Sequence, residues 1–172
     1  MSEFLTSAAQ SASMTLIAPT RPRLREILAR SHPELRAFYE YWDRKRAGRR
    51  MPARADLDPA EMVRFLPNLI LADVESLEPL SLVYRLVGTR EVAFRGKDPT
   101  GQKVAEGFSC RSRAAALAHY RMVIERRMPI FDNDRRTSPQ AALSEHGTIF
   151  LPLSDDGQTV NKVLVYTAFE SG

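Results

Sequence analysis

The stretch LVYRLVGTREVAFRGKDPTG, residues 82–101, decides the fold. It begins with a run of β-branched, aromatic and other apolar residues, which predicts a β-strand over residues 82–88. Three glycines and a proline then interrupt the pattern, and they predict short helical pieces joined by sharp turns over residues 89–110. These pieces must cover a face of the sheet to which the strand belongs.

The segments on either side of this stretch predict the rest of a sheet. Residues 68–75 (NLILADVE) predict a strand that pairs with 82–88 in a hairpin. The alanine-rich residues 112–127 predict a long helix, with Ser109 or Ser112 as its N-cap. The sequence DDGQ predicts a hairpin turn between the last two strands, because Asp-Gly favours such turns. The three expected C-terminal strands cover residues 129–137, 144–153 and 159–169.

The clearest helix is expected over residues 34–47, where apolar side chains recur every three or four positions. This stripe predicts core packing against the sheet. Three of its aromatic residues are also our candidates for contact with a second copy of the chain: Phe38, Tyr41 and Trp42.

Two features frame this helix. Asp58 followed by Pro59 predicts a helix of one or two turns that ends before Pro67. Residues 1–30 are rich in Ser, Ala and Thr at their start and predict a flexible tail, to which RPRLREILAR can add a short helical turn before His32. The folded domain is therefore expected over residues 31–172.

The order of these elements predicts an α+β domain. Its core is a five-stranded antiparallel sheet, helices are inserted between the second and third strands, and an N-terminal helix covers part of the other face.

The composition agrees with a single folded domain. The chain has 172 residues, of which 44% are hydrophobic and 27% charged. No apolar run approaches the roughly 20 residues of a membrane-spanning helix, and the N-terminus lacks the basic start of a secretory signal. The single cysteine, Cys110, has no partner for an internal disulfide. We therefore expect a cytoplasmic protein without a membrane partner.

The positive charge is concentrated near the N-terminus. Residues 21–50 hold ten Lys and Arg against four acids, while the whole chain carries only +4. Such a segment can bind nucleic acid, but the interleaved acids and the lack of a DNA-reading motif favour a solvated helix face.

Several short motifs, taken together, resemble a known family. These motifs are PARADLDP, FLPNLILADVE, YRLVGT, GKDPTG, MPI and FLPLSDDG, and they extend from about Leu35 to Phe169. They are similar to those of bacterial stand-alone PAS-domain proteins. The resemblance implies a PAS fold and a sensory or protein-interaction module without catalysis, often a homodimer, that passes its signal to a separate signalling protein.

In a PAS fold the sheet and the inserted helices enclose a pocket or a packed core, where we expect a small, largely apolar or anionic ligand. The candidate ligand-binding residues are Tyr84, Arg85, Leu86, Phe94, Phe108, Leu117, Tyr120, Phe150 and Tyr166. Arg85 lies within a predicted strand, and a buried arginine requires a counter-charge. We favour an ion pair with Asp56, Asp58 or Asp98 over a contact with an anionic ligand.

The sequence does not identify a cofactor: haem through His119 and flavin are both disfavoured, and no metal site is expected. In haem-binding PAS domains a histidine on the long helix ligates iron, but His119 is only at the border of the apolar face of its helix. Flavin photochemistry needs a reactive cysteine, and Cys110 lacks the sequence around it that light-sensing relatives have. The three histidines, His32, His119 and His146, are too far apart in sequence to predict a metal site. The main alternative to a ligand-binding sensor is a scaffold protein with a solid core.

Overall fold

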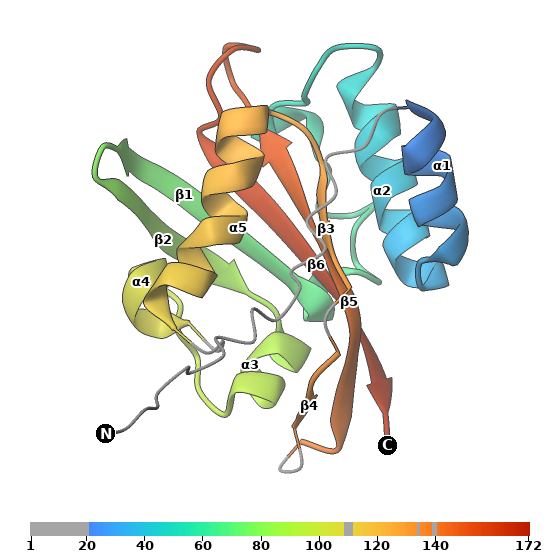
Figure 1. Ribbon diagram of the computed structural model, residues 1–172, viewed down its shortest axis with the longest axis vertical. Helices are drawn as coiled ribbons and strands as arrows, with labels where there is room; N and C mark the ends of the chain where they lie inside the picture. The colour runs from blue at the N-terminus through green and yellow to red at the C-terminus, as the bar shows by residue number, and fades with distance from the viewer. Residues whose placement is uncertain (1–20, 109–111, 134, 139–140) are drawn as a thin grey trace, which may run out of the picture.

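The computed structural model describes residues 21–108, 112–133, 135–138 and 141–172 (Figure 1). Its sheet has the strand order β2-β1-β6-β5-β3 with antiparallel pairing throughout, and β4 adds a short pairing to β5. The strands are β1 (Leu69–Leu77), β2 (Leu80–Val87), β3 (Ile130–Asp132), β4 (Thr137–Ser138), β5 (Leu143–Leu153) and β6 (Lys162–Ser171). The predicted α+β fold with an antiparallel sheet is confirmed. The single strand expected over residues 129–137 is divided into β3 and β4, so the described part of the chain has six strands instead of five.

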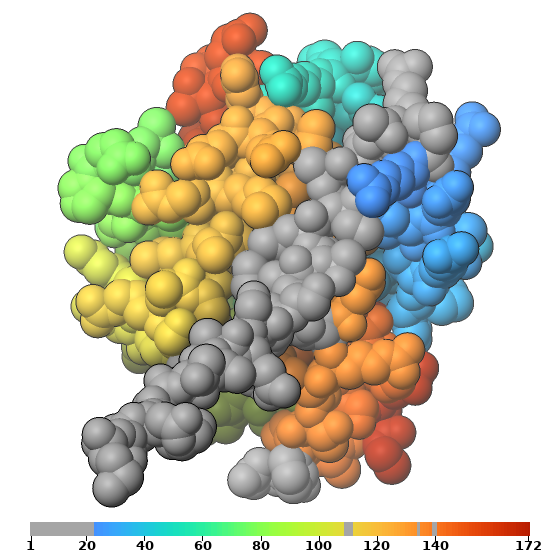
Figure 2. All heavy atoms as spheres, viewed as in Figure 1, coloured from blue at the N-terminus to red at the C-terminus, as the bar shows by residue number. Residues whose placement is uncertain are grey.

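The helices lie on both faces of the sheet. They are α1 (Arg21–Arg30), α2 (Pro33–Arg46), α3 (Thr89–Arg95), α4 (Val104–Gly107) and α5 (Arg113–Arg126), with two short 3₁₀ turns at Arg54–Asp56 and Leu66–Asn68. In Figure 1, α1 and α2 lie on one side of the sheet and α3, α4 and α5 on the other, as the prediction of helices inserted between β2 and β3 requires. The space-filling view shows α4 and α5 forming one part of the surface and α1 and α2 another (Figure 2). We call the face toward α3–α5 the inner face and the face toward α1 and α2 the outer face. None of the described helices is long and apolar enough to cross a membrane.

The alternation of side chains along β6 divides the core between these two faces. Val165 lies on the inner face, and its neighbour Tyr166 packs on the outer face, where its ring stacks on Phe38 of α2 with centroids 4.9 Å apart. The indole nitrogen of Trp42 donates a hydrogen bond to the carbonyl of Pro152 on β5 (3.1 Å). The predicted core packing of the α2 stripe is thus confirmed.

This packing bears on the expected interface with a second copy. Phe38, Tyr41 and Trp42 are each 2% exposed or less, because α2 turns Phe38 and Trp42 toward its own sheet and Tyr41 toward Phe65 and the backbone of Asp58. They have no free surface for a second copy, so a homodimer would have to use other side chains.

Local capping explains where the two long helices begin. The hydroxyl of Ser112 accepts a hydrogen bond from the backbone N–H of Ala115 (3.1 Å) at the start of α5. Ser109, the other expected cap, and Cys110 lie outside the described residues. His32 caps α2, since its Nδ1 accepts from the N–H of Glu34 (3.2 Å).

Two N-terminal expectations differ from the structure. The helix predicted after Asp58 is a series of turns, because both backbone groups of Asp58 bond to the Tyr41 hydroxyl, at 3.1 and 3.4 Å, and hold the segment against α2. Residues 21–30, which we assigned to the tail, form α1, and this helix buries Ile27 against the core. The rest of the expected tail, residues 1–20, lies outside the described residues.

Candidate functional site

A cavity of about 580 Å³ lies between the inner face of the sheet and helices α3 and α5, and we call it the inner cavity. Its apolar walls are largely aromatic, and they come from both layers. The aromatic side chains are Tyr84, Phe94, Phe108, Tyr120, Phe150 and Phe169. Tyr120 meets Phe150 edge to face at 5.4 Å, and Phe94 lies 5.1 Å from Phe169. The cavity therefore provides flat apolar surfaces of the kind that small-molecule sites use.

The structure brings five of the nine candidate ligand-binding residues into this lining: Tyr84, Phe94, Phe108, Tyr120 and Phe150. The other four lie elsewhere. Leu117 packs against the core from a partly buried position, and Leu86 is 39% exposed. Tyr166 faces α2 on the outer side of the sheet, and its hydroxyl donates to Glu34 (3.2 Å).

Arg85 is the clearest correction among these four. Its side chain is 65% exposed, so the premise that it is buried in the strand is wrong. Its partner is Asp73 on β1 (2.7 Å), which also binds Lys162 of β6, and not Asp56, Asp58 or Asp98. Although burial opposes ionisation of Asp73, the hydrogen bonds from Lys162 and Arg85 outweigh it and lower the pKa of Asp73. The three residues form a charged ladder across neighbouring strands.

The inner cavity contains a buried ion pair that the sequence analysis did not single out. Glu91 and Arg95 lie one turn apart on α3, with Arg95 Nε 3.3 Å from Glu91 Oε2. Burial raises the pKa of Glu91, and Arg95 and Thr167 offset only part of this rise. Burial opposes the charge of Arg95, but Glu91 and then Tyr84 outweigh it, so the pKa of Arg95 is raised. The i,i+4 spacing of opposite charges within the short segment EVAFR was the available sequence signal.

A second ion pair, between Arg136 and Glu145, also lines the inner cavity. Arg136 Nε lies 2.7 Å from Oε2 of Glu145, whose side chain is 2% exposed. The Thr148 hydroxyl donates to the other oxygen of Glu145 (2.8 Å) and lies 3.2 Å from the Thr167 hydroxyl. Either hydroxyl can be the donor in this contact, and the Thr167 hydroxyl also lies within hydrogen-bond reach of Glu91.

His119 lines the inner cavity, whereas the helical spacing had placed it only at the border of the apolar face of its helix. Its ring stacks on Phe150 at 5.0 Å, and its Nε2 lies 2.8 Å from a carboxylate oxygen of Asp132 on β3. Nδ1 lies 3.2 Å from the carbonyl of Ala115. Both nitrogens thus face protein oxygens, and iron ligation at Nε2 would require the Asp132 contact to break.

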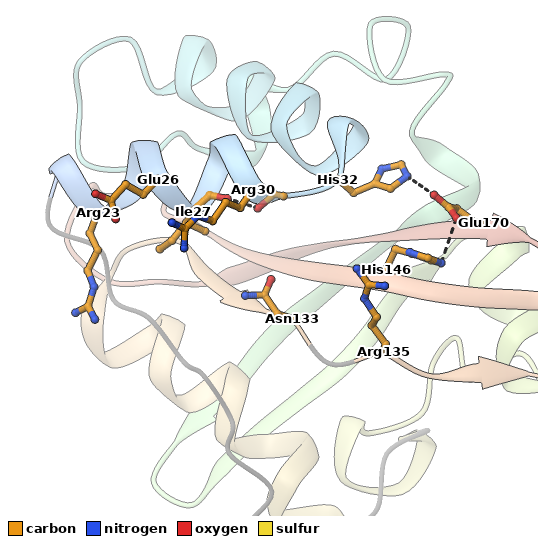
Figure 3. A pocket seen from close by; sticks show the side chains of 10 residues that line it. Arg23, Glu26, Ile27, Arg30, His32, Asn133, Arg135, His146 and Glu170 are labelled. Atoms are coloured by element: carbon orange, nitrogen blue, oxygen red, sulfur yellow. Dashed lines mark hydrogen bonds and ion pairs between the residues drawn. The ribbon is translucent and has the colours of Figure 1, made fainter.

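A second pocket, about 650 Å³, lies between α1 and the sheet, and we call it the outer pocket (Figure 3). His32 and His146 both point at the carboxylate of Glu170, each with its Nε2 3.2 Å from one oxygen. These two histidines, which are far apart along the sequence, are neighbours in the fold, with ring centroids 6.2 Å apart. The fold brings the start of α2 next to β5, which the distance along the chain concealed.

The outer pocket is nevertheless a poor metal site. Nδ1 of His32 accepts the N–H of Glu34, so its Nε2 must carry the proton that points at Glu170 and is not free to bind a metal. Among the described residues, no group of three or more His, Cys, Asp or Glu could hold a metal ion. The pocket walls also consist mainly of exposed charged side chains, such as Arg23 and Arg30. The inner cavity is therefore the stronger candidate for a ligand site.

The comparison with known families agrees with this architecture. Residues 30–166 match the family described as PAS domain, and the chain belongs to that family. The chain matches no curated protein and no solved structure. PAS domains are generally sensory modules without catalysis, which makes a sensory or signalling role the class of function for this chain.

Proposed function

We propose that the chain is a non-catalytic sensor that binds a small, largely apolar molecule in the inner cavity. The observation that supports this proposal best is the cavity itself, because its volume of about 580 Å³ lies within the range of roughly 300–1,000 Å³ typical of ligand pockets. A scaffold protein with a solid core would instead fill this space with side chains.

The position of the cavity also suits a sensor. A ligand there would touch α3 and α5 as well as the sheet, so binding favours the arrangement in which the helices close over the inner face. The helices can transmit this preference to a partner, either a separate signalling protein or a second copy of the chain. PAS domains often mediate such dimerisation or partner binding.

The experiment is native mass spectrometry of the protein purified from the cells that make it. We expect an added mass that is released on unfolding. The variant Ala115→Phe places a large side chain in the cavity wall and should lose that mass, while Ala114→Phe, at an exposed position of the same helix, should keep it.

Thermal unfolding of the three proteins completes the test. Loss of a ligand should lower the melting temperature of the Ala115→Phe protein relative to the ligand-bound wild type. A wild-type protein without added mass, together with an Ala115→Phe variant that is more stable than the wild type, would contradict the proposal and support the scaffold alternative.

A further inference from the structure

Among the described residues, two of the three arginines that line the inner cavity are already committed to carboxylates of the chain, while the third, Arg135, is exposed. Arg95 pairs with Glu91, and Arg136 pairs with Glu145. Arg95 also donates to the carbonyl of Gly107 (3.1 Å) and lies with its guanidinium 5.2 Å from the centre of the Tyr84 ring. An anionic ligand deep in the cavity would therefore have to compete with an internal carboxylate for each of these arginines.

One acceptor in the cavity, in contrast, is left over. Oε1 of Glu91 is buried and has no hydrogen-bond partner among the described residues, while Oε2 faces Arg95. The Thr167 hydroxyl lies near both Glu91 and the Thr148 hydroxyl (3.2 Å from the latter), and its single hydrogen does not use up the acceptor capacity of the Glu91 carboxylate. Folded proteins rarely leave a buried carboxylate oxygen unsatisfied, so this atom indicates a place where an outside donor belongs.

The remaining lining of the cavity indicates what the part of the ligand away from Glu91 should be. Phe94 lies one turn of α3 from Glu91, and Phe108, Phe150 and Tyr120 provide further aromatic surface in the same cavity. Flat apolar groups pack well against such rings.

We propose that the inner cavity selects a ligand with a planar apolar body and a hydrogen-bond-donating head, an ammonium or a hydroxyl, and that Glu91 Oε1 accepts from this head. The proposal rests on the proposed function, since it specifies the ligand class for the same cavity. It narrows the expectation of an apolar or anionic ligand by excluding a carboxylate head at Glu91.

Four one-ring probes that differ only in their head test the proposal: benzylamine, benzyl alcohol, toluene and benzoate. Binding is measured on the unmodified full chain at neutral pH, by titration of backbone amide NMR signals from the cavity residues. We expect benzylamine and benzyl alcohol to bind about tenfold more tightly than toluene or benzoate, the size of effect that a hydrogen bond to a charged group gives.

The variant Glu91→Gln provides a sharper readout. Its amide oxygen can keep the contact with Arg95, which directs the amide N–H₂ into the cavity and turns the free acceptor into a donor. We expect the order of the probes to reverse, with weaker binding of benzylamine and tighter binding of benzoate. Glu75→Gln, at an exposed position on β1, is the matched control and should leave the order unchanged.

The outcomes separate the two proposals. If none of the probes shifts the cavity signals, cavity binding fails, and the ligand class fails with it. If benzoate or toluene binds to the wild type as tightly as benzylamine, cavity binding stands and the proposed ligand class is overturned. The order of the four probes on the wild type decides this even if Glu91→Gln does not fold.

Discussion

Gly88 joins β2 to α3 at a point where no side chain fits. Its φ of −66° is ordinary for any residue, so the reason for glycine is not a turn that needs a positive φ. A Cβ at this position would lie 2.3 Å from the carbonyl oxygen of Leu66 and 2.4 Å from that of Pro67. The close approach also brings the N–H of Gly88 to the carbonyl of Leu69 (2.7 Å).

We therefore expect Gly88→Ala to destabilise the fold by at least about 2 kcal/mol, because the backbone on both sides must move apart. Gly48→Ala is the control: Gly48 has a φ of 79° but no atom within 4 Å of a Cβ, so only the backbone penalty of about 1 kcal/mol applies. Urea unfolding measures both values. Equal losses in the two variants would contradict the steric explanation.

Asp156 stabilises the turn between β5 and β6 through its charge. Its Oδ1 accepts from the N–H groups of Thr159 (2.7 Å) and Gln158 (2.8 Å) and from the Ser154 hydroxyl (2.9 Å). These bonds lower the pKa of Asp156 from 3.8 to about 2.

A carboxylate with a lowered pKa in the folded state stabilises the fold above its ordinary pKa. This contribution is present above pH 3.8 and is lost as the pH falls through about 2. We expect Asp156→Asn to reduce the loss of stability across this window, measured by chemical unfolding at a series of pH values. Parallel curves for the variant and the wild type would show that the turn does not depend on this charge.

Among the elements, α2 connects sequence pattern and tertiary structure most directly. Its apolar residues recur with helical spacing, and the same side chains cover the outer face of β5 and β6. The stacking of Phe38 on Tyr166 and the hydrogen bond from Trp42 to Pro152 fix the helix on the sheet.

Trp42→Ala should destabilise the fold by about 3–5 kcal/mol, since it removes a fully buried aromatic side chain. Trp42→Phe keeps a ring but loses the indole N–H and should cost less, while Glu40→Ala, at an exposed position of the same helix, should have little effect. Thermal and urea unfolding test this order. A small loss for Trp42→Ala would mean that α2 is only loosely attached.

At the scale of the whole molecule, the sheet separates a packed helical layer on one face from the candidate ligand site on the other. The outer face is occupied by α2 and α1, and the inner face encloses the candidate site with α3 and α5. The basic segment 21–50 contributes to the outer layer, where Lys45 pairs with Glu61, Arg46 with Asp43 and Arg49 with Asp56. These pairs agree with a solvated face and give no specific support for nucleic-acid binding.

Much of this arrangement could be predicted from the sequence, because spacing along the chain carries the information. The hairpin of β1 and β2, the inserted helices and the β5–β6 pairing all follow from local patterns of apolar residues and turn residues. The turns after Asp58 could not be predicted in this way. They depend on the Tyr41 hydroxyl, which lies 17 residues away in the sequence.

The candidate site could be predicted only in part for the same reason. Aromatic residues such as Tyr84 and Phe150 were recognisable as pocket candidates by their type and element. Arg85 was not assignable to a face, because the register between β1 and β2 shifts between Leu71 and Ala72 and so breaks simple alternation.

The sequence by itself predicted most of the elements and their order, since the period of apolar residues and the turn residues act locally, and its motifs indicated the family. Only the tertiary structure decided which side chains share the inner cavity and that Glu91 has an oxygen left without a partner. It also decided that His32 meets His146 across 114 residues of chain. The physical reason is that burial and charge pairing depend on which faces of distant elements meet, and no local pattern contains that information.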